Sequence, residues 1–253
     1  MFVEKFAAWA ATADASARCD AIAALCKSWS DPALDEADRL DCEAIFAQFL
    51  HDSTEAVRVA LARGLSMTDA APRAFLWTLA ADTPPVAAQV YAFSMHFRPA
   101  DLADAARSAD PLVQSAVAAR GDLDAATIRA LVEEGCCDAA LSLLANDAVA
   151  LSPSLKHALA LRHMDVAAMR GALLECDDLW PDTRHLLAMR LTAALSCFAA
   201  DCGARERNAR LENDTILHIA CDAGLEHLER FMRHLSNHGK LTAGLLLQAV
   251  CGG

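Results

Sequence analysis

Three histidines near the end of the chain have the residue type and spacing to suggest a metal site. His227, His234 and His238 fall at i, i+7 and i+11, positions that share one face of a helix. At 1.5 Å of rise per residue they spread over about 16 Å of helix axis, too far for all three to reach one ion. At most His234 and His238 could act together. Because Asn237-His238-Gly239 is typical of a helix end, where a histidine favours the helix dipole, we expect surface histidines and no bound metal.

Two further groups contain catalytic residue types. Cys136 and Cys137 lie near a predicted helix start, where the dipole could lower a thiol pKa. Adjacent cysteines point in different directions on a helix, so we expect one buried and one partly exposed thiol without special reactivity. His157, His163 and Asp165 form a superficial acid-base set. They straddle the end of one predicted helix and the start of the next, and nothing brings a nucleophile to them.

Sequence motifs of the common enzyme classes are missing. We find no Gly-x-Gly-x-x-Gly, no phosphate-binding Gly-x-x-x-x-Gly-Lys, no Gly-x-Ser-x-Gly and no His-Glu-x-x-His. Four tryptophans, Trp9, Trp29, Trp77 and Trp180, could line a ligand groove, but their positions in predicted helices favour packing. The sequence therefore designates no catalytic, cofactor-binding or metal-binding residue, and no cofactor is expected.

Charge and cysteine usage restrict the partners and the compartment. The 253 residues carry 22 Lys and Arg against 34 Asp and Glu, a net charge of -12 that would repel a phosphate backbone. Ten scattered cysteines without a Cys-x-x-Cys pair indicate reduced thiols in the cytoplasm. Glu4 precedes the short apolar stretch at residues 6–11, which argues against a signal peptide, and Arg190 interrupts the longest apolar run. We expect no nucleic-acid partner and no membrane span.

The elements that position these residues are predicted to be helices throughout. Ala and Leu dominate the apolar content, and both lose little side-chain entropy in a helix. Apolar residues recur at three and four positions, as in Val57, Ala60 and Leu61. Prolines fall between these segments, where they are tolerated in a first helical turn: Pro32, Pro72, Pro84, Pro85, Pro99, Pro111, Pro153 and Pro181. The sequence contains no credible strand.

The predicted helices repeat as pairs. Acidic helix-start residues return every 27 to 30 residues, at Asp52, Asp82, Asp110, Asp138 and Asp165. Second helices return every 26 or 27 residues, at Leu76, Leu102, Ile128 and Leu155. A short helix pair cannot bury its apolar face alone, so successive pairs must stack and share a core. The pattern predicts an all-α superhelix, a solenoid of HEAT-like pairs with right-handed stacking; the alternative is an irregular helical bundle.

Three parts follow from this pattern: a helical cap at residues 1–51, HEAT-like repeats at 52–178 and a C-terminal helical segment at 179–253. In the last part, residues 205–210 are polar and are predicted to be a connection, with helices after it. The segment Leu241–Cys251 is apolar almost all round, and such a helix must be covered on more than one side. We expect either truncation of a longer protein or burial of this helix in a homo-oligomer.

A family resemblance enters at the segment from Asp52 to Arg63, Asp-Ser-Thr-Glu-Ala-Val-Arg-Val-Ala-Leu-Ala-Arg, and at the repeats that follow it. Together with the ending Leu241–Gly253, this pattern resembles the bacterial, mainly alphaproteobacterial, family called domain of unknown function 2336, over most of the chain from about Ala15. The resemblance implies a HEAT-like fold in a cytoplasmic bacterial protein, and it brings no activity or catalytic residue. Arg58 has no counterpart at Ala87, Gln114 or Ala167, so a continuous ladder of arginines is not expected.

The function that this pattern favours is binding. Stacked helix pairs form a long curved surface suited to a protein or an extended peptide, so we expect a protein-protein interaction scaffold or a regulatory binding module and no enzyme. The alternative is a HEAT-like DNA glycosylase or another enzyme acting on nucleic acid. That class needs a basic groove, which the net charge of -12 disfavours.

Overall fold

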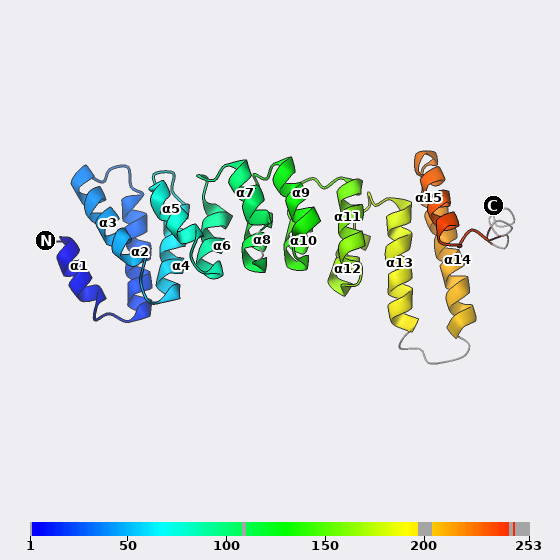
Figure 1. The fold of residues 1–253 in the computed structure, drawn as a ribbon, viewed down its shortest axis with the longest axis horizontal. Helices are drawn as coiled ribbons and strands as arrows, with labels where there is room; N and C mark the ends of the chain where they lie inside the picture. Colours follow the sequence, from blue (N-terminus) through cyan, green and yellow to red (C-terminus); the bar gives the residue numbers. More distant parts are fainter. Residues whose placement is uncertain (1, 108–109, 197–203, 243–244, 246–253) are drawn as a thin grey trace. The chain divides into compact units, whose positions relative to one another are not determined.

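The computed structural model describes residues 2–107, 110–196, 204–242 and 245. In this part of the chain all secondary structure is helical, with fifteen helices and no strand (Figure 1). The first ten helices are α1 (Phe2–Ala10), α2 (Ala15–Trp29), α3 (Glu36–Phe49), α4 (Glu55–Ser66), α5 (Arg73–Ala80), α6 (Pro84–Phe93), α7 (Pro99–Ala106), α8 (Pro111–Ala118), α9 (Ala125–Glu134) and α10 (Cys137–Leu144). The others are α11 (Pro153–His163), α12 (Ala167–Leu174), α13 (Pro181–Ser196), α14 (Ala204–Asp222) and α15 (Leu225–Asn237). The prediction of an all-α protein is confirmed.

Two compact units divide the chain, one of residues 1–149 and one of residues 150–253. The first contains α1 to α10 and the second α11 to α15. The predicted parts at residues 1–51, 52–178 and 179–253 follow the sequence pattern, and this division does not test them.

Helix starts use the residues that the sequence indicated. Five helices have proline as their first residue: Pro84, Pro99, Pro111, Pro153 and Pro181. Pro72 is the N-cap of α5. At the start of α8, a carboxylate oxygen of Asp110 accepts a hydrogen bond from the backbone N–H of Leu112 at 2.9 Å, which satisfies one of the otherwise unpaired first-turn donors. Pro32 differs, because it lies in the turn between α2 and α3 and begins no helix.

The repeating apolar positions form the core of the first unit. Val57 and Leu61 of α4, Val86 and Val90 of α6 and Val117 of α8 are fully buried. Helix α4 packs against α2 and α6, helix α8 packs against α6 and α10, and α7 packs against α9. Contacts between helices two apart in sequence are those that stacked pairs require. The HEAT-like class and the right-handed stacking remain predictions.

Polar side chains at the fourth residue of a helix join consecutive pairs. Arg58 of α4 donates from Nε and Nη2 to the carboxylate of Asp82, before α6, at 2.6 and 2.9 Å. Its Nη1 donates to the carbonyl of Asp52, before α4 itself, at 2.7 Å. Arg18 of α2 pairs with the carboxylate of Asp52 at 3.1 Å. Each arginine thus ties its helix to the loop that begins the next pair.

Gln114, the fourth residue of α8, makes the same kind of link without charge. Its Oε1 accepts a hydrogen bond from the backbone N–H of Cys136 at 2.8 Å, and its Nε2 donates to the carbonyl of Ala106 at 3.1 Å. Ala87 of α6 and Ala140 of α10 stand at the equivalent positions and have no polar side chain. The row of arginines is therefore interrupted at Ala87 and Gln114, as predicted. The prediction for α12 is wrong, because its fourth residue is Arg170 and not Ala167, and Nη1 of Arg170 donates to the carbonyl of Met164 at 2.9 Å.

The C-terminal part corrects one prediction. Residues 205–210, predicted as a connection, belong to α14, which runs without a break to Asp222. Most of the predicted helix Leu241–Cys251 lies outside the described residues. Leu245, which is described, is 4% exposed and packs with Ile219 and Phe231.

Loss of the Arg58 link should destabilise the first unit. Arg58→Met keeps the aliphatic stem but leaves the partly buried Asp82 carboxylate without its guanidinium, whose hydrogen bonds hold the pKa of Asp82 below its usual value. We expect a loss of about 1–3 kcal/mol in the free energy of unfolding, measured by urea denaturation followed by circular dichroism. Arg129→Met is the control, because Arg129 is exposed on α9 and forms no ion pair within the described residues. Equal midpoints for the two variants would contradict the link.

Gly64 should be required for the approach of α4 to α2. A Cβ atom at Gly64 would lie 2.5 Å from Sγ and 2.7 Å from Cβ of Cys26. Gly64→Ala should therefore force the helices apart and lower stability by about 1–3 kcal/mol. Gly171 is the matched control, because a Cβ there meets nothing within 4 Å and alanine favours a helix by up to about 1 kcal/mol. The midpoint temperature of thermal unfolding should fall for Gly64→Ala and should not fall for Gly171→Ala. A change in the same direction in both variants would refute the packing argument.

Candidate functional site

The three histidines singled out in the sequence do not share one environment. His227 is partly exposed, and its Nε2 lies 3.9 Å from a carboxylate oxygen of Glu226. His238 is the C-cap of α15, as expected for a helix end, and its ring lies 4.3 Å from that of His234. Within the described residues no group of three or more His, Cys, Asp or Glu side chains could hold a metal ion.

His234 has a buried partner that the sequence pattern does not reveal. Its Nε2 lies 3.1 Å from Nδ1 of His185 on α13, which is 1% exposed. One proton between the two nitrogens makes this a hydrogen bond, whereas a proton on each would place two donors face to face. Burial lowers the pKa of His185 to about 4, and His234 acts in the same direction. Both imidazoles are therefore neutral near pH 7.

Further contacts hold the side chains around this pair, although Oδ1 of Asp182 and Nε2 of His185 are buried without a hydrogen-bond partner in the described part of the chain. Arg230 of α15 stacks over the ring of Trp180 at 3.5 Å and pairs with Asp182 at 3.0 Å. His157 shares a hydrogen bond of 2.7 Å with the hydroxyl of Thr183, which is fully buried. These contacts connect α11, α13 and α15 inside the second unit. They explain the positions of His157 and Trp180 as structural.

The other sequence candidates are separated as well. Asp165 pairs with Arg190 at 3.7 Å, so the structure does not join it with His157. Cys136 is the N-cap of α10, where its Sγ accepts a hydrogen bond from the backbone N–H of Ala139 at 3.4 Å. Burial and the neighbouring Asp138 raise the pKa of Cys137, the opposite of what a reactive thiol requires.

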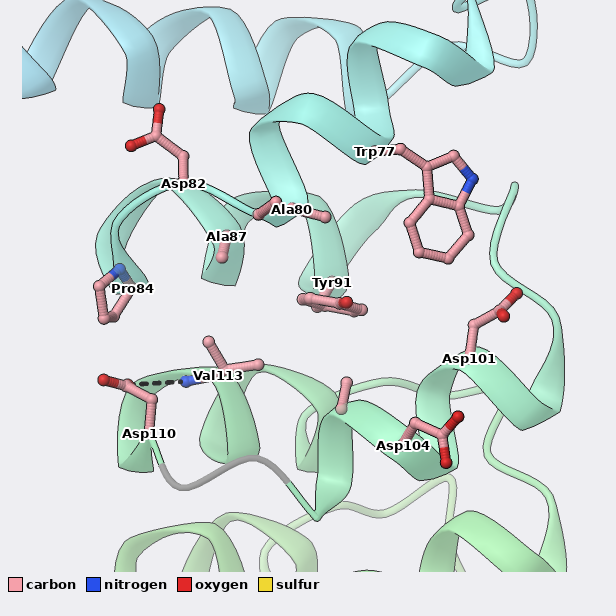
Figure 2. A pocket seen from close by; sticks show the side chains of 12 residues that line it. Trp77, Ala80, Asp82, Pro84, Ala87, Tyr91, Asp101, Asp104, Asp110 and Val113 are labelled. Carbon is pink, nitrogen blue, oxygen red and sulfur yellow. Dashed lines mark hydrogen bonds between the residues drawn. The ribbon is translucent and has the colours of Figure 1, made fainter.

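The most promising binding site is a pocket in the first unit, lined by residues of α5, α6, α7, α8 and the loop between α5 and α6. Its volume is about 480 Å³. The side chains around it are mostly aromatic, acidic or small (Figure 2). They are Trp77, Ala80, Ala81, Asp82, Pro84, Ala87, Tyr91, Asp101, Asp104, Ala105, Asp110 and Val113.

Aromatic rings and carboxylates meet at one end of this pocket. Figure 2 shows Trp77, Asp101 and Asp104 gathered there, with Tyr91 beside them. The ring of Phe97 packs against both aromatic side chains: its centroid lies 4.9 Å from that of Trp77 and 4.8 Å from that of Tyr91. Phe97 thus holds both rings in position. Trp77 remains 42% exposed.

The carboxylates give this end of the pocket a negative potential. Burial raises the pKa of Tyr91, and the nearby carboxylates of Asp101 and Asp104 act in the same direction. Asp101 accepts a hydrogen bond from the backbone N–H of Arg98 at 2.9 Å and also pairs with the exposed guanidinium of Arg98 at 3.4 Å. Asp104 is 82% exposed and only loosely paired with Arg107 at 3.4 Å. An aromatic face flanked by carboxylates is suited to a cation.

The sequence predicts a role for only some residues of this pocket. It indicates Trp77 as a packing residue and Asp82 and Asp110 as helix starts, whereas Tyr91, Asp101 and Asp104 have no sequence signal of their own. The repeat spacing was the available clue, because it places α5 and α7 in equivalent positions of consecutive pairs. No described helix has the length and apolar character needed to cross a membrane.

The described part of the chain is all-helical, with a pocket among α5 to α8. Residues 86–253 match the family model described as "Uncharacterised protein conserved in bacteria (DUF2336)", and the chain belongs to this family. The match includes the ending at Leu241–Gly253 but not the segment from Asp52 to Arg63, which also carried the resemblance. No curated protein and no solved structure matches the chain.

The buried histidine pair should make stability depend on pH. Because the pKa of His185 is about 4 when folded and about 6.5 when unfolded, the unfolded chain binds the extra proton between these values. Stability is thus retained above pH about 6.5 and falls toward pH about 4, by up to about 1.4 kcal/mol per pH unit for this one proton. The free energy of unfolding, measured by urea denaturation at several pH values in this range, should change less with pH for His185→Gln than for the unchanged protein.

The control for this measurement is His218→Gln, because His218 is 80% exposed on α14 and near Asp222. Carboxylates that titrate in the same range affect all three proteins equally. If the free energy of unfolding of His185→Gln depends on pH as it does in the unchanged protein, the buried pair does not cause the loss of stability in acid.

Proposed function

We propose that the chain is a protein-binding module of HEAT-like helix pairs, in which the pocket between α5 and α8 accepts a basic side chain of the partner. The observation that supports this most is the exposed face of Trp77 beside Tyr91, Asp101 and Asp104. A cytoplasmic location is part of the proposal.

The chemistry of the pocket favours arginine or lysine. A guanidinium or ammonium over an indole face gains about 0.5–2 kcal/mol, depending on how far it is desolvated. Asp104 is free to turn toward such a group, since its present contact with Arg107 is long and exposed. The net charge of -12 would also speed the encounter with a basic partner.

The DNA glycosylase alternative gains no support from this site. Such an enzyme needs a positively charged groove, and the carboxylates here would repel a phosphate backbone. The candidate acid-base residues His157 and Asp165 also have separate partners.

A displayed library of random peptides, selected on the immobilised full chain, tests this function. Recovered peptides should be enriched in arginine and lysine over the starting library. Their affinity should fall about tenfold in the double variant Asp101→Asn, Asp104→Asn, because two rim charges are removed, and should fall with added salt. Asparagine at residue 101 can still accept the hydrogen bond of the helix cap.

The double variant Asp69→Asn, Glu133→Gln is the matched control. Both residues are exposed in the first unit, neither lines the pocket, and the change in net charge is the same. Affinity that falls equally in both double variants would mean that only net charge attracts the peptides. Selection of peptides without basic residues would also reject the pocket as a cation site.

A further inference from the structure

A second, apolar groove lies on helices α2, α4 and α6 of the first unit. Its volume is about 760 Å³, and no residue that lines it lines the acidic pocket. Small side chains form much of its surface, among them Ala23, Ala56, Val59 and Ala60. Ala23 and Ala56 are exposed to solvent.

The close approach of the helices explains why this surface is apolar and open. Gly64 lies against the side chain of Cys26, so α4 and α2 meet there with a side chain from α2 alone. Burial raises the pKa of the Cys26 thiol to about 12, so this thiol stays neutral. Beside the small residues lies Met67, a large apolar side chain that is 69% exposed to water. Covering it with a partner would be favourable through the hydrophobic effect.

The charged side chains that line the groove are basic, although the chain is strongly acidic. They are Lys27 and Arg63, and neither forms an ion pair with a carboxylate in the described part of the chain. The guanidinium of Arg63 lies 5.9 Å from the ring centre of Phe93, which is 42% exposed. By contrast, Arg18 and Arg58 in the same helices are paired.

We propose that this groove docks an amphipathic helix of a partner protein, one with acidic side chains beside its apolar stripe. The apolar lining would bury the stripe, and Lys27 and Arg63 would pair with the carboxylates. The inference rests on the proposed function in that both make the chain a binding module, but it concerns a different surface and a partner segment of opposite charge.

A helix suits the groove better than an extended segment. No described element offers a strand edge, so an extended chain would leave its backbone N–H and C=O groups unpaired against the apolar surface. A helix satisfies these groups internally. Its apolar side chains at i, i+3, i+4 and i+7 then lie along one face, as other helix-in-groove complexes require.

The test uses a fluorescein-labelled synthetic helix with leucine at those four spacings and glutamate on both flanks. Fluorescence anisotropy of this peptide with the full chain should show saturable binding. The double variant Lys27→Glu, Arg63→Glu should bind it at least about tenfold more weakly. A second peptide with lysine in place of every glutamate should show the reverse preference.

Arg129→Glu is the control for net charge, and Asp101→Asn with Asp104→Asn is the control for the acidic pocket. Both should bind the glutamate peptide like the unchanged protein. If circular dichroism shows that Lys27→Glu, Arg63→Glu does not fold, the double variant Lys27→Gln, Arg63→Gln replaces it. This variant should show a smaller loss of affinity for the glutamate peptide.

Three results would overturn the proposal. The first is no saturable binding of the glutamate peptide. The second is a loss of binding in Arg129→Glu as large as the loss in the double variant Lys27→Glu, Arg63→Glu. The third is self-association, or binding to vesicles of anionic lipid, that Lys27→Glu, Arg63→Glu abolishes while binding of the glutamate peptide is unaffected. Each leaves the basic-peptide selection on the acidic pocket intact, so the two proposals can fail separately.

Discussion

The stacking in the first unit depends on side chains that bridge one helix pair to the next. Arg58 binds the loop before its own helix and the loop before α6, and Gln114 does the equivalent for α8 with an amide. Arg120, after α8, donates to the carbonyls of Tyr91 and Ser94 at 2.7 and 2.9 Å, at the end of α6. Both ends of the helices are thereby fixed, and the acidic pocket and the apolar groove lie between elements held in this way.

The helices could be predicted because their signals are local. A proline or an acidic residue at a helix start and apolar residues at three and four positions act within one or two turns, whatever the rest of the chain does. The prediction of a connection at residues 205–210 was wrong because it relied on polarity, while the local helix signals there were overlooked. Arginine and glutamate are good helix formers, and residues 204–222 contain no glycine or proline, so polarity alone did not indicate a connection.

The site could not be predicted to the same extent, because its residues meet only in the folded chain. His185 and His234 are 49 residues apart, and nothing near either one indicates the other. Trp77 and Asp104 come from α5 and α7, so their proximity depends on how the pairs stack. The position of Gly64 against Cys26 likewise decides where a groove can open.

The bridges also have a consequence for how the first unit opens. Arg18 and Arg58 join neighbours only, and Ala87 of α6 supplies no link of this kind. Such a chain of nearest-neighbour couplings does not behave as a single cooperative block. Between α6 and α8 the link from the fourth residue is missing and Arg120 bridges the far end of α6, so we expect this coupling to be weaker than that between α4 and α6. Because α6 lines both the pocket and the groove, a ligand in either would add a contact to the helix that lacks this link.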